Sequence, residues 1–251
     1  SPSITMGTNG FTILKDGNTI TDQSSNSNNF SLGGGTLTKT EDCPSNVFAT
    51  FNSIYKNLNQ PAFTNGNLTA TSSSSGYHNA FSTIAVSTGK WYAEFKRGSS
   101  EYQIGISSLA DAESLFPGTD YYIGETSKSL GISSGDGKYR IGTSATTYGA
   151  SYASGDIIGI ALDLTNKKLY ASKNGAWSNG SGAWSSSTFD AAVGAIDISS
   201  LIPSGELGYI GCSNTGTSTL NANFGQGFFG TTAVASANAG ANGNGIMEYP
   251  V

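Results

Sequence analysis

The sequence predicts an all-β fold, an antiparallel two-sheet β-sandwich with little helix. Roughly a dozen short stretches alternate apolar and polar residues with the period of two that is typical of strands. Gly-, Asn-, Asp- and Ser-rich turn signals separate them at short intervals. Only residues 109–116 have a helical pattern, and Pro117-Gly118 ends it within two turns. Many short strands with tight turns are the pattern of a sandwich.

The central unit of this pattern is residues 155–177, GDIIGIALDLTNKKLYASKNGAW. Ile158, Ile160 and Leu162 alternate with smaller or polar residues, which predicts a strand with one buried face. Residues 165–167 form a polar break, 168–173 resume the alternation, and Asn174-Gly175 is a strong signal for a tight turn. The stretch therefore predicts an antiparallel hairpin.

Further strands are expected on both sides of this hairpin. In residues 90–96, the alternation predicts that Trp91 points into the core and that Glu94 points outward. Residues 177–188, which contain two tryptophans, have the Ser/Gly/Asn composition of a long loop. The other strands are expected at 68–71, 80–86, 102–106, 121–124, 129–132, 139–141, 191–198, 207–212 and 220–224.

These segments also carry a family resemblance. The order G-D-x-I-G-x-A-x-D, turn, strand, K-N-G at 155–175 is similar to the signature of SPRY (B30.2-like) domains. Phrases at 89–95, 102–106, 208–211 and 220–225 fall in the matching order, so that the resemblance covers roughly residues 80–229. It implies a concanavalin-like jelly roll that binds partners through loops at one end.

The composition divides the chain into three parts. Residues 1–45 contain short apolar runs at 11–14 and 30–32 around a polar loop, and they read as added strands or as a connector from an upstream domain. Residues 46–229 are the expected SPRY-like sandwich, and 230–251 a Gly/Ala/Asn-rich linker or tail that packs on something else. Because the chain starts at Ser1-Pro2 and stops at Val251, we expect a piece of a longer protein.

A second phrase suggests a context for the chain. Residues 41–52, EDCPSNVFATFN, resemble the segment that precedes SPRY-like regions in large virion proteins of marine bacteriophages. The upstream phrase G-T-N-G-F at 7–11 belongs to the same context. The resemblance implies a tail-fibre or other structural component of a virion.

The charge balance argues against two kinds of partner. Only 12% of the residues are charged, the formal net charge is −5, and no run of Lys or Arg occurs, so we expect no nucleic-acid partner. No apolar run is long enough to span a bilayer, so we expect no membrane insertion. With 34 Gly and abundant Ser, Thr and Asn, the surface is one of hydroxyls and amides, which suits extracellular and virion proteins.

The ionisable residues do not form a catalytic pattern. Glu94 has no second carboxylate at strand spacing, and Asp111 with Glu113 reads as a pair of solvated loop carboxylates. The single histidine, His78, lies in a Ser/Gly/Asn stretch and is expected to be exposed and idle. We therefore expect no catalytic residue and no enzyme.

Metal ligands and disulfides have equally weak signals. Asp120 and Asp136 are isolated among neutral residues, and no Cys/His cluster suits zinc, so no metal site and no cofactor are expected. Cys43 and Cys212 are far apart in the sequence, and two free buried thiols are favoured over a disulfide, which remains the alternative.

Aromatic residues in or beside the expected loops are the candidate ligand-binding residues. Exposed Tyr and Trp side chains anchor recognition surfaces and stack on sugars. The competing interpretation is that half of them cap sandwich edges or fill an interface between protomers. The candidates are Tyr121, Tyr122, Tyr148, Tyr152, Trp177 and Trp184.

Two functional hypotheses follow, with a third behind them. The first is a non-enzymatic bacteriophage virion structural protein, a tail fibre or capsid appendage. Its SPRY-like module would bind other virion proteins, copies of itself, or a host-surface glycan or protein, and its location would be the virion. The second is a lectin-like carbohydrate-binding module of a secreted or cell-surface protein. A cellular SPRY adaptor is the third, which the low charge disfavours.

Overall fold

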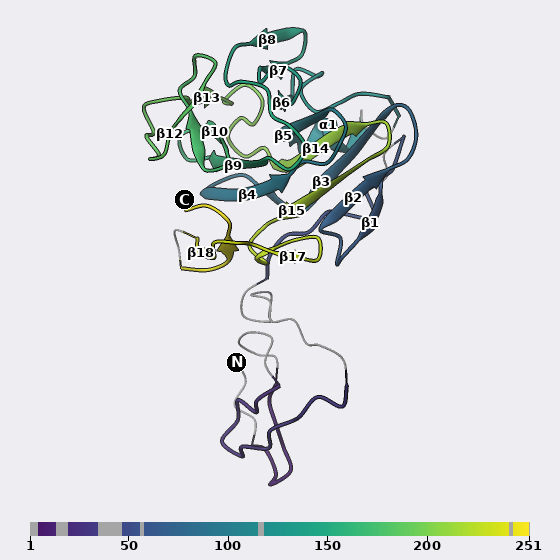
Figure 1. The fold of residues 1–251 in the computed structure, drawn as a ribbon, viewed down its shortest axis with the longest axis vertical. Coiled ribbons are helices and arrows are strands. Elements are labelled where there is room, and N and C mark those ends of the chain that lie inside the picture. Colours follow the sequence, from purple (N-terminus) through teal and green to yellow (C-terminus); the bar gives the residue numbers. More distant parts are fainter. Residues whose placement is uncertain are drawn as a thin grey trace.

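Two antiparallel sheets pack against each other in the computed structural model (Figure 1), which describes residues 5–13, 20–34, 47–55, 58–114, 118–240 and 243–250. The large sheet has the order β1 (Ala62–Thr64), β2 (Thr69–Ser72), β15 (Ser218–Asn223), β4 (Lys90–Lys96), β9 (Ile157–Asp163), β10 (Lys168–Lys173), β11 (Ala176–Ser178), β12 (Trp184–Ser186), with β13 (Ile196–Asp197) on β10. The small sheet has the order β3 (Tyr77–Val86), β14 (Gly208–Thr215), β5 (Tyr102–Ser108), β6 (Ser129–Ser133), β7 (Tyr139–Ile141), β8 (Ser144–Thr146). Among the described residues the one α-helix is α1 (Leu109–Ser114), so the predicted all-β sandwich is confirmed.

The predicted central hairpin is formed by β9 and β10. Leu162 pairs with Leu169 and Ile160 with Ala171 in an antiparallel register. The turn after β10 has positive φ at both Asn174 (49°) and Gly175 (80°). That pair of angles is the type I′ geometry whose twist matches the two strands it joins, which explains the Asn-Gly sequence.

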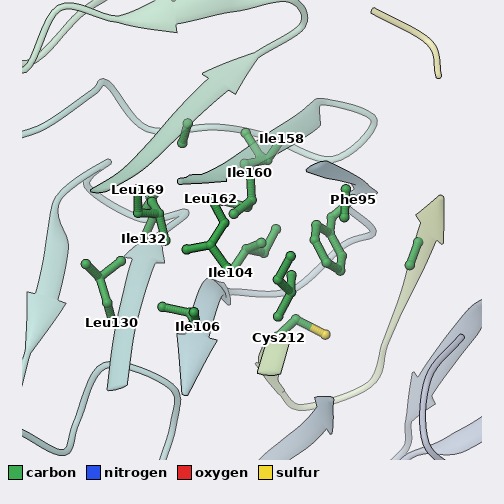
Figure 2. Close-up of a cluster of buried hydrophobic side chains, with 14 of the residues drawn as sticks. Phe95, Ile104, Ile106, Leu130, Ile132, Ile158, Ile160, Leu162, Leu169 and Cys212 are labelled. Atoms are coloured by element: carbon green, nitrogen blue, oxygen red, sulfur yellow. The ribbon is translucent and has the colours of Figure 1, made fainter. Parts of the chain in front are cut away.

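The core lies between the two sheets. Ile158, Ile160 and Leu162 of β9 point toward Ile104 and Ile106 of β5, as Figure 2 shows. All five side chains are almost completely buried. The burial of these apolar side chains between the two sheets is the main driving force for folding.

Two expected strands and one expected loop differ from the structure. Residues 121–124 form turns, because the amides of Ile123 and Gly124 bond to the side chains of Ser213 and Ser129 (2.7 and 2.8 Å) instead of to a strand. Of residues 191–198, only Ile196–Asp197 is a strand. The loop expected at 177–188 instead contains β11 and β12, which extend the large sheet at its edge, where short Ser-rich strands suffice.

Residues 5–13 and 20–34 lie apart from the sandwich (Figure 1) and contain no strand, so the interpretation of this region as strands added to the sandwich is wrong, and the connector interpretation stays a prediction. Instead, the Asp22 carboxylate accepts hydrogen bonds from the amides of Thr12, Ser24 and Asn28 (2.8, 2.8 and 2.7 Å). These bonds, with that from Thr12 foremost, lower the pKa of Asp22 to about 2. Leu14 lies outside the described residues.

The C-terminal segment folds back on this same chain. The region expected to be a linker or tail, 230–251, contains β17 (Thr232–Ala233), which pairs with β16 (Phe228–Phe229), and the small sheet of β18 (Asn238–Ala239) with β19 (Ile246–Met247). Asn223 Nδ2 of the large sheet donates to the Ile246 carbonyl (2.9 Å). The three-part domain division remains a prediction.

None of the helices within the described ranges is long and apolar enough to cross a membrane.

Two polar residues, His78 and Asp111, are more buried than the sequence predicts. His78 lies on β3 rather than in a loop and is buried, with Nε2 near the carbonyl of Ser74 (3.2 Å). Asp111 is buried in α1, because the helix packs against the small sheet. Cys212 is a buried thiol on β14, as expected, and burial raises its pKa, whereas Cys43 lies outside the described residues.

Candidate binding surface

The outer face of the large sheet, opposite the core, presents a row of aromatic side chains. Tyr92 of β4 and Tyr170 of β10 both pair with Ala161 of β9, so the three residues lie side by side across three strands. Trp177 of β11 pairs with Ser172 and adds a fourth strand to the same face. The Tyr92 and Trp177 rings are 6.4 Å apart. Period-two alternation places all of these residues opposite the core positions.

A glycine makes room for this row. A Cβ atom at Gly159, next to Ala161 on the same face, would lie 2.3 Å from the Tyr92 hydroxyl and 2.6 Å from Ser172 Oγ. Any side chain at this position would therefore displace Tyr92 from its place in the row.

The aromatic row lines one part of a groove of about 690 Å³, which also reaches Ile84 and Val86 of β3 in the small sheet. Phe189 and Ala191, in the loop before β13, line one part of it. The C-terminal segment lines another through Met247. The groove also reaches Trp91 at the start of β4. Its volume is within the range of small-ligand sites, and its lining combines aromatic side chains with a few polar ones, which is typical of such sites.

A smaller cavity of about 190 Å³ adjoins the groove. Both share Tyr170, Trp177 and Phe189, whose rings contact edge to face, with centroids 5.0 Å (Tyr170–Phe189) and 4.9 Å (Trp177–Phe189) apart. Asn179 and Asp190 add polar atoms to the small cavity. Phe189 is 43% exposed, so this part of the wall faces solvent.

A buried carboxylate fixes the C-terminal wall of the groove. Glu94 has an exposed fraction of 0%, because the C-terminal segment covers the outward face on which the sequence places it. Its oxygens accept hydrogen bonds from the amides of Glu248 (2.8 Å) and Tyr249 (2.9 Å) and from Asn223 Nδ2 (3.1 Å). Burial raises the pKa of Glu94, and the hydrogen bonds from these two amides oppose that rise.

The end of the aromatic row is closed by ion pairs between neighbouring strands. Lys90 lies 3.8 Å from Asp163, and Lys168 lies 2.8 Å from Asp197. The hydrogen bond from Lys168 holds the pKa of Asp197 below its usual value. Because charges of both signs alternate here, this end of the sheet has no strong net field.

The structure brings two of the six predicted ligand-binding aromatics to these cavities. Trp177 lines both of them and Tyr148 lines the small one. Both side chains are buried rather than exposed, with Trp177 only 6% exposed. The Tyr148 hydroxyl donates to the Gly194 carbonyl and accepts from the Ala171 amide (both 2.9 Å), so it has a structural role.

The other four predicted aromatics lie elsewhere. Tyr152 is buried, and its hydroxyl donates to the Ile132 carbonyl (2.8 Å), so the expectation of an exposed loop residue is wrong for it. Trp184 is half-buried on β12 and donates from Nε1 to the Ala150 carbonyl (2.7 Å). Tyr121 and Tyr122 lie near β3, where Tyr122 packs on Tyr77 (4.9 Å).

Sequence reasoning missed Tyr92, Tyr170 and Phe189 as site residues and misplaced Trp91. Tyr92 lies on a strand and not in a loop, whereas the aromatics selected from the sequence are only those in or beside expected loops. Trp91 is 45% exposed rather than buried, because it lies at the start of β4 and its Nε1 donates to the Thr88 carbonyl (2.7 Å). The signal that could have found the row is the set of aromatics on strands that alternate with core residues.

The side chains that bond to the Glu94 carboxylate are those of Asn223 and Tyr92. No group of three His, Cys, Asp or Glu side chains in the described ranges is placed to hold a metal ion.

The fold and the groove together define an antiparallel β-sandwich with an aromatic-lined groove. No family model matches the sequence, and no curated protein matches it. Among solved structures, the chain is similar to the SPRY domain of human HERC1, with 16% sequence identity and a TM-score of 0.47. The match covers 68% of this chain and 96% of that domain.

Proposed function

We propose that this chain is a non-enzymatic binding module of a bacteriophage virion structural protein, a tail fibre or capsid appendage. The observation that carries the binding part is the groove of about 690 Å³, which Tyr92, Tyr170 and Trp177 line on the outer face of the large sheet. Aromatic side chains in a concave, mostly apolar site are typical of recognition surfaces.

The virion part of the proposal is supported by the sequence. The phrases at 7–11 and 41–52 resemble segments of phage virion proteins, and only 12% of the residues are charged. A surface of hydroxyls and amides suits a particle that must stay soluble outside the cell. The ligand on this proposal is a host-surface glycan or protein, or another virion component.

The test of this proposal is competition for adsorption. The purified chain, added in excess to host cells, is expected to slow the attachment of the phage that carries the parent protein. Phe189→Ala removes an exposed groove residue and should abolish the competition. Tyr121→Ala, which removes a partly exposed aromatic away from the groove, is the matched control and should compete like the unmodified chain.

Two results would contradict the proposal. If the unmodified chain does not affect adsorption, host recognition by this module is wrong. If Tyr121→Ala abolishes the competition and Phe189→Ala does not, the binding surface lies near Tyr121 and not at the groove.

The second candidate is a lectin-like carbohydrate-binding module of a secreted or cell-surface protein. The polar small cavity beside the aromatic row favours it, because sugars present both an apolar face and hydroxyl groups. This candidate predicts saturable glycan binding by a parent protein that is absent from virions. Detection of the parent protein in purified particles would contradict it.

A further inference from the structure

The small cavity of about 190 Å³ lies between β10, β11 and the loop that precedes β13. Tyr148, Tyr170, Trp177 and Phe189 supply its apolar wall, and no Lys, Arg or His side chain lines it. Sites for drug-sized ligands have volumes of about 300–1,000 Å³, so this cavity fits a single ring rather than a chain of them.

Two polar side chains at the cavity each have one atom engaged and one atom free. Asn179 Oδ1 accepts from the amides of Ser181 (2.8 Å) and Ala183 (3.2 Å), while its Nδ2 has no partner among the described residues. Asp190 Oδ1 accepts from the Ala192 amide (2.8 Å), while its Oδ2 has no partner in the same part of the chain. Both residues are exposed, so the free donor and the free acceptor at the cavity are in water and are open to a ligand.

This combination selects a ligand class. An anion would find no cation on the lining and would meet the Asp190 carboxylate, so anions are disfavoured. A quaternary ammonium would suit the aromatic rings and Asp190, but the free amide donor of Asn179 would have nothing to bond. An uncharged sugar ring uses all three features, because it has an apolar face, hydroxyl donors and hydroxyl acceptors.

We propose that the small cavity binds one uncharged sugar residue of a glycan whose neighbouring residues lie in the groove. Tyr170, Trp177 and Phe189 line both spaces, which makes the two continuous. The inference rests on the proposed binding function and adds to it the ligand class and the two residues, Asn179 and Asp190, that recognise the hydroxyls.

The experiment is an array of neutral, sialylated and sulfated glycans, followed by titration of the best binder. Asn179→Asp keeps the acceptor that holds the turn, replaces the free donor by an acceptor and adds a negative charge. Asp190→Asn keeps the acceptor for the Ala192 amide, replaces the free acceptor by a donor and removes a negative charge. Each is expected to weaken binding of a neutral glycan about tenfold or more. Asn52→Asp is the matched control, because Asn52 Oδ1 also holds a turn, through the Ile54 amide (3.1 Å), away from both cavities. All variants should melt at the temperature of the unmodified chain.

The outcomes separate this inference from the proposed function. Neutral glycan binding that both cavity variants weaken and Asn52→Asp does not would support the inference. Binding that Phe189→Ala weakens but the two cavity variants do not would overturn the cavity assignment and leave the groove function standing. Tighter binding of tetramethylammonium by Asn179→Asp, without glycan binding, would overturn the ligand class. An array without any signal would overturn the inference, and the proposed function would also fail only if adsorption competition failed too.

Discussion

At the residue scale, Glu94 has the most unusual environment in the described chain. It is completely buried on the outer face of the large sheet, and its carboxylate accepts hydrogen bonds from the backbone amides of Glu248 and Tyr249. A buried carboxylate is costly unless hydrogen bonds compensate it, and here the donors are those of the segment that forms a wall of the groove. Glu94 therefore couples the position of that segment to the sheet.

The first prediction concerns Glu94→Ala. The substitution leaves the amides of Glu248 and Tyr249 without their acceptor, which costs about 1–3 kcal/mol for each group that stays buried. We expect a lower free energy of unfolding and faster hydrogen exchange at these two amides, with the core amides of β9 still protected. Glu113→Ala, at an exposed carboxylate of α1, is the control and should change neither quantity. Unchanged exchange at 248 and 249 in Glu94→Ala would show that the carboxylate does not hold the segment.

The second prediction is a pH dependence with a definite sign. Because burial raises the pKa of Glu94 above its value of 4.5 in the unfolded chain, the folded state binds the proton more tightly. The contribution of Glu94 to stability therefore increases as the pH falls through the folded pKa toward 4.5. The difference in unfolding free energy between the unmodified chain and Glu94→Ala should grow from pH 8 to about pH 4.5. A difference that shrinks over this window, measured by denaturant titration, would contradict the sign.

At the element scale, the β9–β10 hairpin organises both faces of the large sheet. Ile158, Ile160 and Leu162 enter the core, and Ala161 between them faces the groove. A single strand thus contributes to stability with one set of residues and to the binding surface with the other.

The third prediction tests this division between faces. Ile160→Asp should unfold the domain, because an unpaired charge in the core costs several kcal/mol. Ala161→Asp, one residue away on the opposite face, should remain folded, since Ala161 is only half-buried. Circular dichroism of the two variants measures this, and a folded Ile160→Asp would show that the face assignment is wrong.

The sequence predicted elements best where local turn chemistry and alternation agreed. The Asn174-Gly175 turn and the strand at 90–96 were both found, because their signals lie within a few residues. The β11–β12 hairpin was missed, since short edge strands rich in Ser and Gly have the composition of loops. The sequence also missed the burial of Glu94, which depends on a segment more than 150 residues away in the chain.

The same reasoning explains the incomplete prediction of the site. Trp177 was selected because it is aromatic and near a turn, and it does line the groove. Tyr148 and Tyr152 were selected by the same criterion, yet their hydroxyls bond to backbone groups in the interior. Whether an aromatic side chain near a turn points inward or outward depends on tertiary packing, which no local pattern contains.

At the scale of the whole molecule, the described chain has three parts. The sandwich contains the hydrophobic core, and the C-terminal segment forms one wall of the groove. The N-terminal unit, residues 5–13 and 20–34 around Asp22, lies apart from both (Figure 1). Four large apolar side chains of the N-terminal unit are exposed, namely those of Met6, Phe11, Phe30 and Leu32.

The fourth prediction concerns assembly. On the proposed function the protein belongs to a tail fibre or capsid appendage, and such assemblies are symmetric, so it should be a trimer or another closed multimer in solution. Sedimentation or light scattering of the native protein measures its mass. A strictly monomeric parent protein would contradict the assembly expected of a virion component.

The central claim is that this sandwich serves as the binding module of a virion structural protein. Its most direct test is quantitative mass spectrometry of particles purified from a lysate that contains the parent protein. We predict that its peptides copurify with the particles, in a constant number of copies per particle. Their absence from the particles, together with abundance in the soluble fraction, would contradict the claim and favour the lectin-like module.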